Sequence, residues 1–321
     1  HNGEYTSLGL LIDLADTLAL RESIILNTSK VFQPDIFLVD KEPGGLKDEV
    51  ISTLAYFKDT DTQCILGLRD VMDSPELLKK EWQKKNVLPL LEDLYDELWV
   101  YGPAGVSNPL QGLDIKQVVT DKTLFTGYLP RKLPQQVDTD SINFPGKPYI
   151  LVTPGGGGDG VEMIDWVLRA YESSPTLMPA LFVLGPFMPA AERNEFLNRA
   201  ESLPHVKAMT FSNHLEHLMA EAEAVIAMGG YNTFCEILSF DKPALILPRT
   251  QPREEQLIRA RNAAAVGLLS MLDLDSERLT ETMVESILKL LEQDKPSKHK
   301  LDKLLSGLDF VTGRFGELVV K

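Results

Sequence analysis

The sequence predicts an α/β protein built from two doubly wound domains, each with a parallel sheet. Short, continuous apolar runs alternate with amphipathic helical stretches, as they do in βαβ units. One polar, proline-rich stretch at residues 129–148 interrupts this alternation. The chain has 321 residues, of which 44% are hydrophobic, which is enough for two domains of ordinary size.

The first third of the chain is predicted to form half of a doubly wound domain. A leucine-rich amphipathic helix is expected over residues 8–30. The elements expected after it are a strand over 35–40, a helix that ends at Tyr56, a strand over 63–70, a helix over 75–94 and a strand over 96–102. Because the strands are apolar throughout, helices should cover both faces of their sheet.

Strands and helices alternate again after the proline-rich stretch. Strands are expected over 149–154, 180–185, 206–211, 224–228 and 244–248, and helices over 161–172, 189–202, 214–221, 231–240, 254–266 and 276–293. Their short connections predict right-handed crossovers. We therefore expect an amino-terminal domain over 1–135, a second domain over 147–296, and carboxyl-terminal helices over 297–321 that could pack back on the first domain.

Composition narrows the functional classes. The formal net charge is −15 at pH 7, so long-range repulsion disfavours unaided binding to nucleic acid. Cys64 and Cys235 lie in apolar stretches without CxxC spacing, which favours buried thiols in a reducing compartment. Apolar runs are too short for a spanning helix and a signal-peptide pattern is missing. We expect a cytoplasmic protein, and a peripheral membrane contact stays open.

Two glycine-rich loops are the main candidates for chemistry. Each follows a predicted strand and opens a helix: TPGGGGDG at 153–160 and MGGYNTFCE at 228–236. At such a junction, unpaired N–H groups and the positive end of the helix dipole favour a diphosphate. Glycines that only make tight turns are the alternative. Two loops at adjacent strand ends favour the ligand, and the lack of GK[ST] disfavours ATP hydrolysis.

Polar residues follow the second loop. Asn232 and Thr233 are expected in the first helical turn, where their side chains can cap the helix or reach a phosphate oxygen. Glu236 lies one turn after Thr233, so its carboxylate could accept both hydroxyls of a ribose. A solvated acid that favours the helix dipole is the alternative role of Glu236.

A second polar group is expected at the start of the next helix. Arg249 and Arg253 lie in the loop after the strand that ends at Pro248, and could neutralise phosphate. Glu255 and Gln256 open the helix over the same sheet edge and could hydrogen-bond sugar hydroxyls. Ordinary helix-start acids are the alternative.

The stretch GGYNTFCEILSFDKPALILPRTQPREEQLIRA resembles the donor-site signature of family 28-type GT-B glycosyltransferases. This group includes the transferase that adds N-acetylglucosamine to a lipid-linked peptidoglycan precursor, and the similarity extends over about residues 148–292. The stretches FLVDKEPGGL and LGLRDVMDSPE also resemble the amino-terminal domain of bacterial members. The resemblance implies two Rossmann-like domains that face a cleft, and a nucleotide-sugar donor in the second domain.

The resemblance also implies roles for individual residues. Gly155, Gly156, Gly157, Gly158, Gly229, Gly230, Asn232 and Thr233 would hold the diphosphate; Phe211, His214 and Leu215 the base; Glu236 the ribose; and Glu255 with Gln256 the transferred sugar. Two features depart from the family. Members open with a glycine-rich loop, often GxGH, in the first Rossmann unit, and no such loop precedes His1, so an opening segment is expected to be missing. Glu255 stands where the peptidoglycan enzyme has an amide, so the sugar stays unassigned.

The implied reaction is an inverting, metal-independent transfer from a nucleoside-diphosphate sugar, with uridine as the expected base, to an unknown acceptor hydroxyl. The glycine-loop N–H groups and a helix dipole can stabilise the departing diphosphate, so no metal and no cofactor are expected. The general base is unassigned; Asp40, Glu42 and Asp70 are weak candidates at strand ends of the first domain. A non-hydrolysing sugar-nucleotide 2-epimerase, a hydrolase, and a non-catalytic binding subunit that needs a partner chain are the alternatives.

Overall fold

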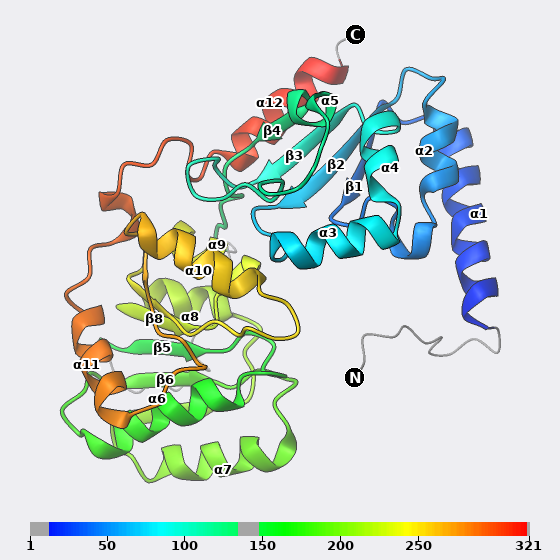
Figure 1. Ribbon diagram of the computed structural model, residues 1–321. Coiled ribbons are helices and arrows are strands. Elements are labelled where there is room, and N and C mark those ends of the chain that lie inside the picture. The colour runs from blue at the N-terminus through cyan, green and yellow to red at the C-terminus, as the bar shows by residue number, and fades with distance from the viewer. Residues whose placement is uncertain (1–12, 134–147, 320–321) are drawn as a thin grey trace. The chain divides into compact units, whose positions relative to one another are not determined.

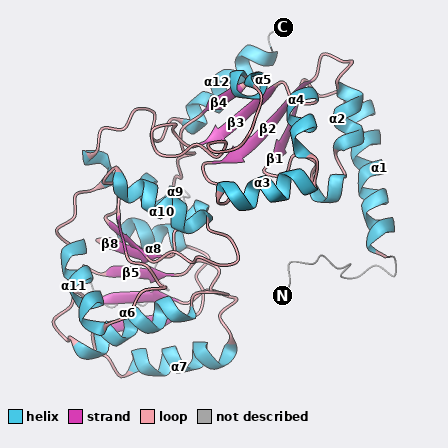
Figure 2. Ribbon diagram, viewed as in Figure 1, coloured by secondary structure: helices cyan, strands magenta, loops and turns pink. Residues whose placement is uncertain are grey.

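The computed structural model describes residues 13–133 and 148–319, which divide into two compact units. Unit 1 contains residues 13–104, 108–127 and 307–319, and unit 2 contains residues 105–107, 128–133 and 148–306. Each unit is built around its own parallel sheet (Figure 1), and strands alternate with helices in both (Figure 2). The predicted α/β class with parallel sheets is confirmed.

Unit 1 has a four-stranded sheet in the order β1-β2-β3-β4. Its strands are β1 (Ile36–Asp40), β2 (Gln63–Arg69), β3 (Glu97–Tyr101) and β4 (Thr123–Phe125). Its helices are α1 (Leu14–Phe32), α2 (Ile51–Phe57), α3 (Pro75–Lys84), α4 (Val87–Asp93), α5 (Gln117–Asp121) and α12 (Gly307–Val319), with a short 3-10 helix over Leu46–Asp48.

Successive side chains of the unit 1 strands point to opposite faces of the sheet, so unit 1 has buried residues on both faces. Leu66, Leu68 and Val100 pack in one buried cluster with residues of α2, α3 and α4. Trp99, the neighbour of Val100, is fully buried and its ring lies 5.8 Å from that of Phe310 on α12. The carboxyl-terminal helix therefore packs in unit 1.

Unit 2 has a six-stranded parallel sheet in the order β10-β9-β8-β5-β6-β7. Its strands are β5 (Ile150–Thr153), β6 (Ala180–Val183), β7 (Val206–Met209), β8 (Ala224–Ala227), β9 (Ala244–Ile246) and β10 (Ser270–Met271). Its helices are α6 (Val161–Ser173), α7 (Ala190–Glu201), α8 (Leu215–Glu221), α9 (Tyr231–Ser239), α10 (Glu255–Ala265) and α11 (Thr280–Leu290), with a 3-10 helix over Pro296–Lys298.

Helices cover both faces of the unit 2 sheet, as its apolar strands predict. The main buried cluster joins Val152 and Ile226 of the strands to Trp166 of α6, Phe196 of α7 and Ile287 of α11. The other face carries α8, α9 and α10 (Figure 1). All residues of β5 and β8 are buried, which makes this sheet a rigid support for the loops at its edge.

The single helix predicted over residues 75–94 is wrong, because two helices occupy this stretch. Helix α3 ends at Lys84, and Asn86 has left-handed backbone angles (φ 50°, ψ 46°) before α4 begins at Val87. Pro89 explains the break: in a continuous helix it would clash with the carbonyl of Lys85 and leave it without a donor. At the third position of a new helix the missing N–H costs nothing.

Other boundaries also differ from the prediction. Asp13 caps α1 by accepting the N–H of Asp16 at 2.8 Å, so this helix begins at Leu14; residues 8–12 of the predicted helix lie outside the described residues. The short elements α5, β4 and β10 were not predicted, because each has at most five residues and offers no periodicity.

Unit 2 contains the described part of the proline-rich stretch and the first part of the tail. After residues 108–127 of unit 1 the chain returns to unit 2 at Tyr128, and residues 134–147 of the predicted linker lie outside the described residues. The second domain was predicted to end at 296, but residues 297–306 stay with unit 2. The reason is local bonding: Ser297 donates twice to the Asp241 carboxylate, and Leu304 O accepts the N–H of Tyr128.

Candidate functional site

Both glycine loops lie at the carboxyl edge of the unit 2 sheet, on neighbouring strands. β5 pairs with β8 in parallel, with Thr153 opposite Ala227, so the loops that follow these strands are adjacent as predicted. From β5 the chain adds β6 and β7 on one side, and then β8, β9 and β10 on the other. The β5–β8 boundary is therefore the point where the strand order reverses, which is where open α/β sheets bind ligands.

The first loop contains glycines of two kinds. Gly157 has φ +88°, and a Cβ there would lie 2.4 Å from the backbone oxygen of Leu184, so packing alone requires glycine. A Cβ on Gly156 or Gly158 would meet only the ring or Cβ of Phe187, at 3.4 and 3.8 Å. The tight-turn interpretation therefore accounts for Gly157, whereas Gly156 and Gly158 leave one side of the backbone accessible.

Backbone donors in this loop are unused. Within the described residues, the N–H groups of Gly156, Gly157 and Gly158 donate no hydrogen bond, while Gly155 N–H bonds to Thr153 Oγ1 at 3.2 Å. Helix α6 begins directly after the loop, with Gly160 at its N-cap. Three unpaired donors before the positive end of a helix dipole form a site that favours an anion.

The second loop brings α9 to the same place. Gly229 has φ +79°, and Gly230 is the N-cap of α9 without a side-chain cap. Asn232 and Thr233 lie in the first turn of α9, as predicted, and a Cβ on Gly155 would lie 3.8 Å from Thr233 Oγ1. The first loop and the start of α9 are therefore close enough to contact one ligand.

Glu236 lies on the same helix, half-buried, one turn after Thr233. Burial raises the pKa of its carboxyl group; the charge of Arg131 opposes this shift and that of Glu216 adds to it. In the part of the chain that the structure describes, no hydrogen bond reaches this carboxylate. A half-buried acceptor without a donor is poorly satisfied, so a ligand hydroxyl would meet an available partner there.

Arg131 anchors the described end of the proline-rich stretch to α9. Its backbone N–H donates to Ser239 Oγ at 2.9 Å, and its Nη2 donates to Asn232 Oδ1 at 3.1 Å. This contact places a guanidinium beside the second loop. Arg131 was not predicted as a site residue, because it lies in a stretch without periodicity. Its sequence signal is a pair of basic residues, Arg131 and Lys132, in a strongly acidic chain.

The start of α10 is organised around Arg249. Its Nη2 donates to Glu255 Oε1 at 2.6 Å, and its backbone N–H donates to Gln256 Oε1 at 3.2 Å. Its Nε lies 3.0 Å from Asp159 Oδ2 of the first loop, an ion pair without a hydrogen bond. Arg249 was predicted to neutralise a phosphate, and the structure pairs it with two carboxylates. Arg253 is half-buried in the same loop.

Glu255 keeps one oxygen unused. Its Oε2 is buried and has no hydrogen-bond partner among the residues that the structure describes, while Gln256 is 8% exposed. Both residues lie in the first turn of α10, as predicted. Because a buried acceptor without a donor costs free energy, Glu255 Oε2 is suited to accept a hydrogen bond from a ligand hydroxyl.

The residues predicted to contact a base lie after β7, on the far side of β6 from β5. Phe211 is 54% exposed, which leaves its ring accessible for stacking. His214 is the N-cap of α8 and Leu215 its first residue. Phe187, 75% exposed on the loop after β6, was missed by the sequence analysis; it packs over Gly156, and its N–H donates to the Gly156 oxygen.

Part of unit 2 resembles a known protein family. Residues 182–307 match the model of the Glycosyltransferase family 28 C-terminal domain. This part of the chain is similar to that domain. Curated relatives are named UDP-N-acetylglucosamine--N-acetylmuramyl-(pentapeptide) pyrophosphoryl-undecaprenol N-acetylglucosamine transferase. The Pseudothermotoga lettingae protein is 26% identical over 57% of this chain and 50% of its own length, and the Geobacillus kaustophilus protein 25% over 59% and 53%. The chain thus spans about half the length of these relatives.

Solved structures show the fold. The calicheamicin glycosyltransferase CalG4 matches with a TM-score of 0.59 at 14% identity, over 97% of this chain and 82% of that one. MurG of Acinetobacter baumannii matches with 0.55 at 10% identity, over 97% and 84%. The UDP-GlcNAc 2-epimerase of Methanocaldococcus jannaschii matches with 0.62 at 13% identity, over 96% and 84%. The GT-B fold predicted by resemblance is confirmed.

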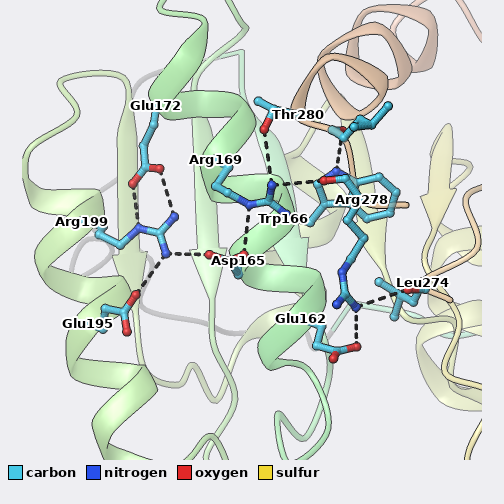
Figure 3. A network of polar contacts seen from close by, with 11 residues as sticks. Glu162, Asp165, Trp166, Arg169, Glu172, Glu195, Arg199, Leu274, Arg278 and Thr280 are labelled. Atoms are coloured by element: carbon cyan, nitrogen blue, oxygen red, sulfur yellow. Dashed lines mark hydrogen bonds and ion pairs between the residues drawn. The ribbon is translucent and has the colours of Figure 1, made fainter. Parts of the chain in front are cut away.

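An ion-pair network joins helices of unit 2 (Figure 3). Arg199 of α7 pairs with Glu172 at 2.7 Å and with Asp165 at 2.8 Å, both on α6, and these pairs raise the pKa of Arg199. Arg278 pairs with Glu162 at 2.6 Å, at the start of α6. Helix α6 is thereby tied to α7 and to the segment before α11, which fixes the helix that begins at the glycine loop.

The three candidate bases in unit 1 have different surroundings. Asp70 is fully buried and accepts the N–H of the next residue at 2.8 Å, which argues against contact with an acceptor. Glu42 pairs with Lys85 at 2.9 Å. Asp40 is exposed at the end of β1; Tyr101 lies near it, and burial, with the charge of Asp40, raises the pKa of Tyr101 to about 12. Asp40 is the candidate that these surroundings favour.

No described helix is long and apolar enough to cross a membrane. Within the described ranges, no group of three or more His, Cys, Asp and Glu residues is arranged to hold a metal ion.

Proposed function

We propose that this chain binds a nucleoside-diphosphate sugar through unit 2 and transfers the sugar to an acceptor hydroxyl. The observation that carries the proposal is the pair of glycine loops beside the β5–β8 switch point, where the N–H groups of Gly156, Gly157 and Gly158 have no partner in the described residues. Unpaired donors before α6 and α9 suit a diphosphate. UDP is the proposed nucleotide, because the names of the curated relatives contain it.

The surrounding side chains fit the other parts of such a donor. The half-buried Glu236 carboxylate is proposed to accept the ribose hydroxyls, and Glu255 Oε2 with Gln256 to contact the transferred sugar. Phe211, His214 and Leu215 would contact the base. The reaction is an in-line displacement at the anomeric carbon with inversion, in which the acceptor oxygen forms the new bond and the nucleoside diphosphate leaves with the electron pair. Loop N–H groups and the helix dipoles stabilise its charge.

Two further points belong to this proposal. Asp40 is the proposed base that takes the proton of the acceptor hydroxyl. The protein acts in the cytoplasm, since Cys64 and Cys235 are both buried free thiols, as in proteins of a reducing compartment.

Ligand binding to the full chain tests the proposal. UDP at about 100 times its Kd should raise the free energy of unfolding by about 2.7 kcal/mol. UMP should give much less, because it lacks the second phosphate. The measurements are isothermal titration and chemical denaturation with each nucleotide. Equal stabilisation by UMP and UDP, or none by either, would remove the phosphate argument.

A sugar-nucleotide 2-epimerase is the second candidate, because the fold also matches the Methanocaldococcus jannaschii epimerase. The two activities differ in their need for an acceptor. A transferase releases UDP from a UDP-sugar only when an acceptor hydroxyl is present, whereas an epimerase changes the sugar configuration without one. Chromatography of UDP-N-acetylglucosamine incubated with the protein alone distinguishes them. A binding subunit without activity would bind the donor and change nothing, with or without acceptor.

A further inference from the structure

An acidic residue lies inside the loop that is proposed to bind the donor diphosphate. Asp159 is the one charged residue of the sequence TPGGGGDG, and its side chain is 53% exposed. A carboxylate beside a phosphate site lowers the affinity for phosphate unless a cation compensates it. The cation at hand is Arg249, whose Nε lies 3.0 Å from Asp159 Oδ2.

Arg249 does not fully compensate this charge, because it is shared. Its Nη2 makes a 2.6 Å hydrogen bond to Glu255 Oε1, so two carboxylates face one guanidinium. The contact to Asp159 is also geometrically poor: Nε is buried and forms no hydrogen bond despite the short distance. The loop therefore keeps negative charge next to its unpaired N–H donors.

We propose that Asp159 determines which nucleotide the loop prefers, because it weakens the binding of free nucleoside diphosphate more than the binding of the sugar-bearing donor. This inference rests on the proposed function. The terminal phosphate of a nucleoside diphosphate is a monoester with about −1.5 to −2 charges at pH 7, but it carries only one charge once a sugar esterifies it. Repulsion by Asp159 scales with that charge. The donor is favoured over the product, which speeds release of the product after transfer.

The test compares UDP with UDP-N-acetylglucosamine by isothermal titration on the full chain at pH 7.5. Asp159→Asn should tighten UDP by about 3- to 10-fold, the effect of one charge removed at roughly 6 Å in a watery site. The Kd of UDP-N-acetylglucosamine should fall by a clearly smaller factor. At pH 5.5, where the terminal phosphate of UDP holds its second proton, the changes in Kd of the two nucleotides should become similar.

Two controls separate this role from others. Asp159→Glu keeps the charge and should keep the wild-type ratio of the two Kd values. Glu285→Gln removes one charge from the surface of α11, where Glu285 pairs with Lys289, and should change neither Kd. Equal tightening of both nucleotides in Asp159→Asn at pH 7.5 would overturn the inference, as would weaker binding of both with an unchanged melting temperature. Wild-type protein that binds neither nucleotide would instead overturn the proposed function, and the inference with it.

Discussion

At the scale of single residues, the proposed nucleotide contact and the proposed sugar contacts lie on two different helices. Glu236 lies on α9 beside the second glycine loop, and Glu255 and Gln256 lie on α10. Among the described residues, the half-buried Glu236 carboxyl receives no hydrogen bond, which fits its proposed role as a binding group. Its raised pKa means that the folded protein holds the proton more tightly than the unfolded chain does.

Glu236→Gln should therefore weaken binding and stabilise the fold. Below the ordinary pKa of glutamate, the protonated Glu236 carboxyl contributes its full stabilisation to the fold. This stabilisation is lost as the pH rises through the raised pKa of the folded protein. At pH 7 the buried negative charge therefore lowers the free energy of unfolding. The variant should melt at a higher temperature than wild type at pH 7, with a smaller difference at pH 4. The binding of UDP and of UDP-sugar should both weaken, by about 1–2 kcal/mol. Calorimetric melting and titration at both pH values measure these effects.

Gln256→Ala is the matched comparison. UDP affinity should hardly change, while turnover falls, because Gln256 is proposed to contact only the sugar. Stability should fall by about 1–3 kcal/mol, since the variant leaves the Arg249 N–H without the acceptor that Gln256 Oε1 provides. If Gln256→Ala weakened UDP as much as Glu236→Gln does, the division between the two helices would be wrong.

At the scale of elements, the loop before α6 combines a structural and a binding requirement. Gly157 contacts the backbone of the β6 loop so closely that a methyl group cannot fit, and the network of Figure 3 holds α6 in place behind it. Gly158 has free space on its side-chain face apart from Phe187. The two glycines should therefore respond differently to the same substitution.

Gly157→Ala should lower the free energy of unfolding by about 1–3 kcal/mol, because of the left-handed φ and the clash with the Leu184 oxygen. Gly158→Ala should leave stability within about 1 kcal/mol of wild type, yet weaken UDP, since the added methyl occupies the accessible face of the loop. Denaturant titration and UDP titration of both variants measure this. If Gly158→Ala lost stability but kept its UDP affinity, all four loop glycines would be needed only for the tight turn.

At the scale of the whole molecule, the proposed transfer uses backbone donors where other enzymes use a divalent ion. The unpaired N–H groups of the first loop and the starts of α6 and α9 supply positive potential for the leaving diphosphate. Transfer should therefore proceed at an unchanged rate in EDTA, measured as UDP release that depends on an acceptor. Complete loss of turnover on chelation, restored by Mg²⁺ or Mn²⁺, would contradict this mechanism. Sodium chloride at matched ionic strength serves as the control.

Local sequence alone determined the fold class and the position of the loops. Apolar runs such as YILVTP and AVIAM specify buried parallel strands, and glycines directly after them specify strand-to-helix junctions. These signals lie within a few residues of each other. They therefore predicted where Asn232, Thr233, Glu255 and Gln256 lie in their helices.

Only the tertiary structure decided which partners these residues have. The pairing of β5 with β8 joins two loops that are about seventy residues apart in the chain, and Arg249 meets Asp159 across about ninety. Arg131 reaches Asn232 from a stretch that carries no periodic signal. Contacts of this kind depend on strand order and packing, which no local pattern encodes. For this reason the sequence could name the candidate ligand groups, while burial, shared charge and unpaired donors became visible only in the folded chain.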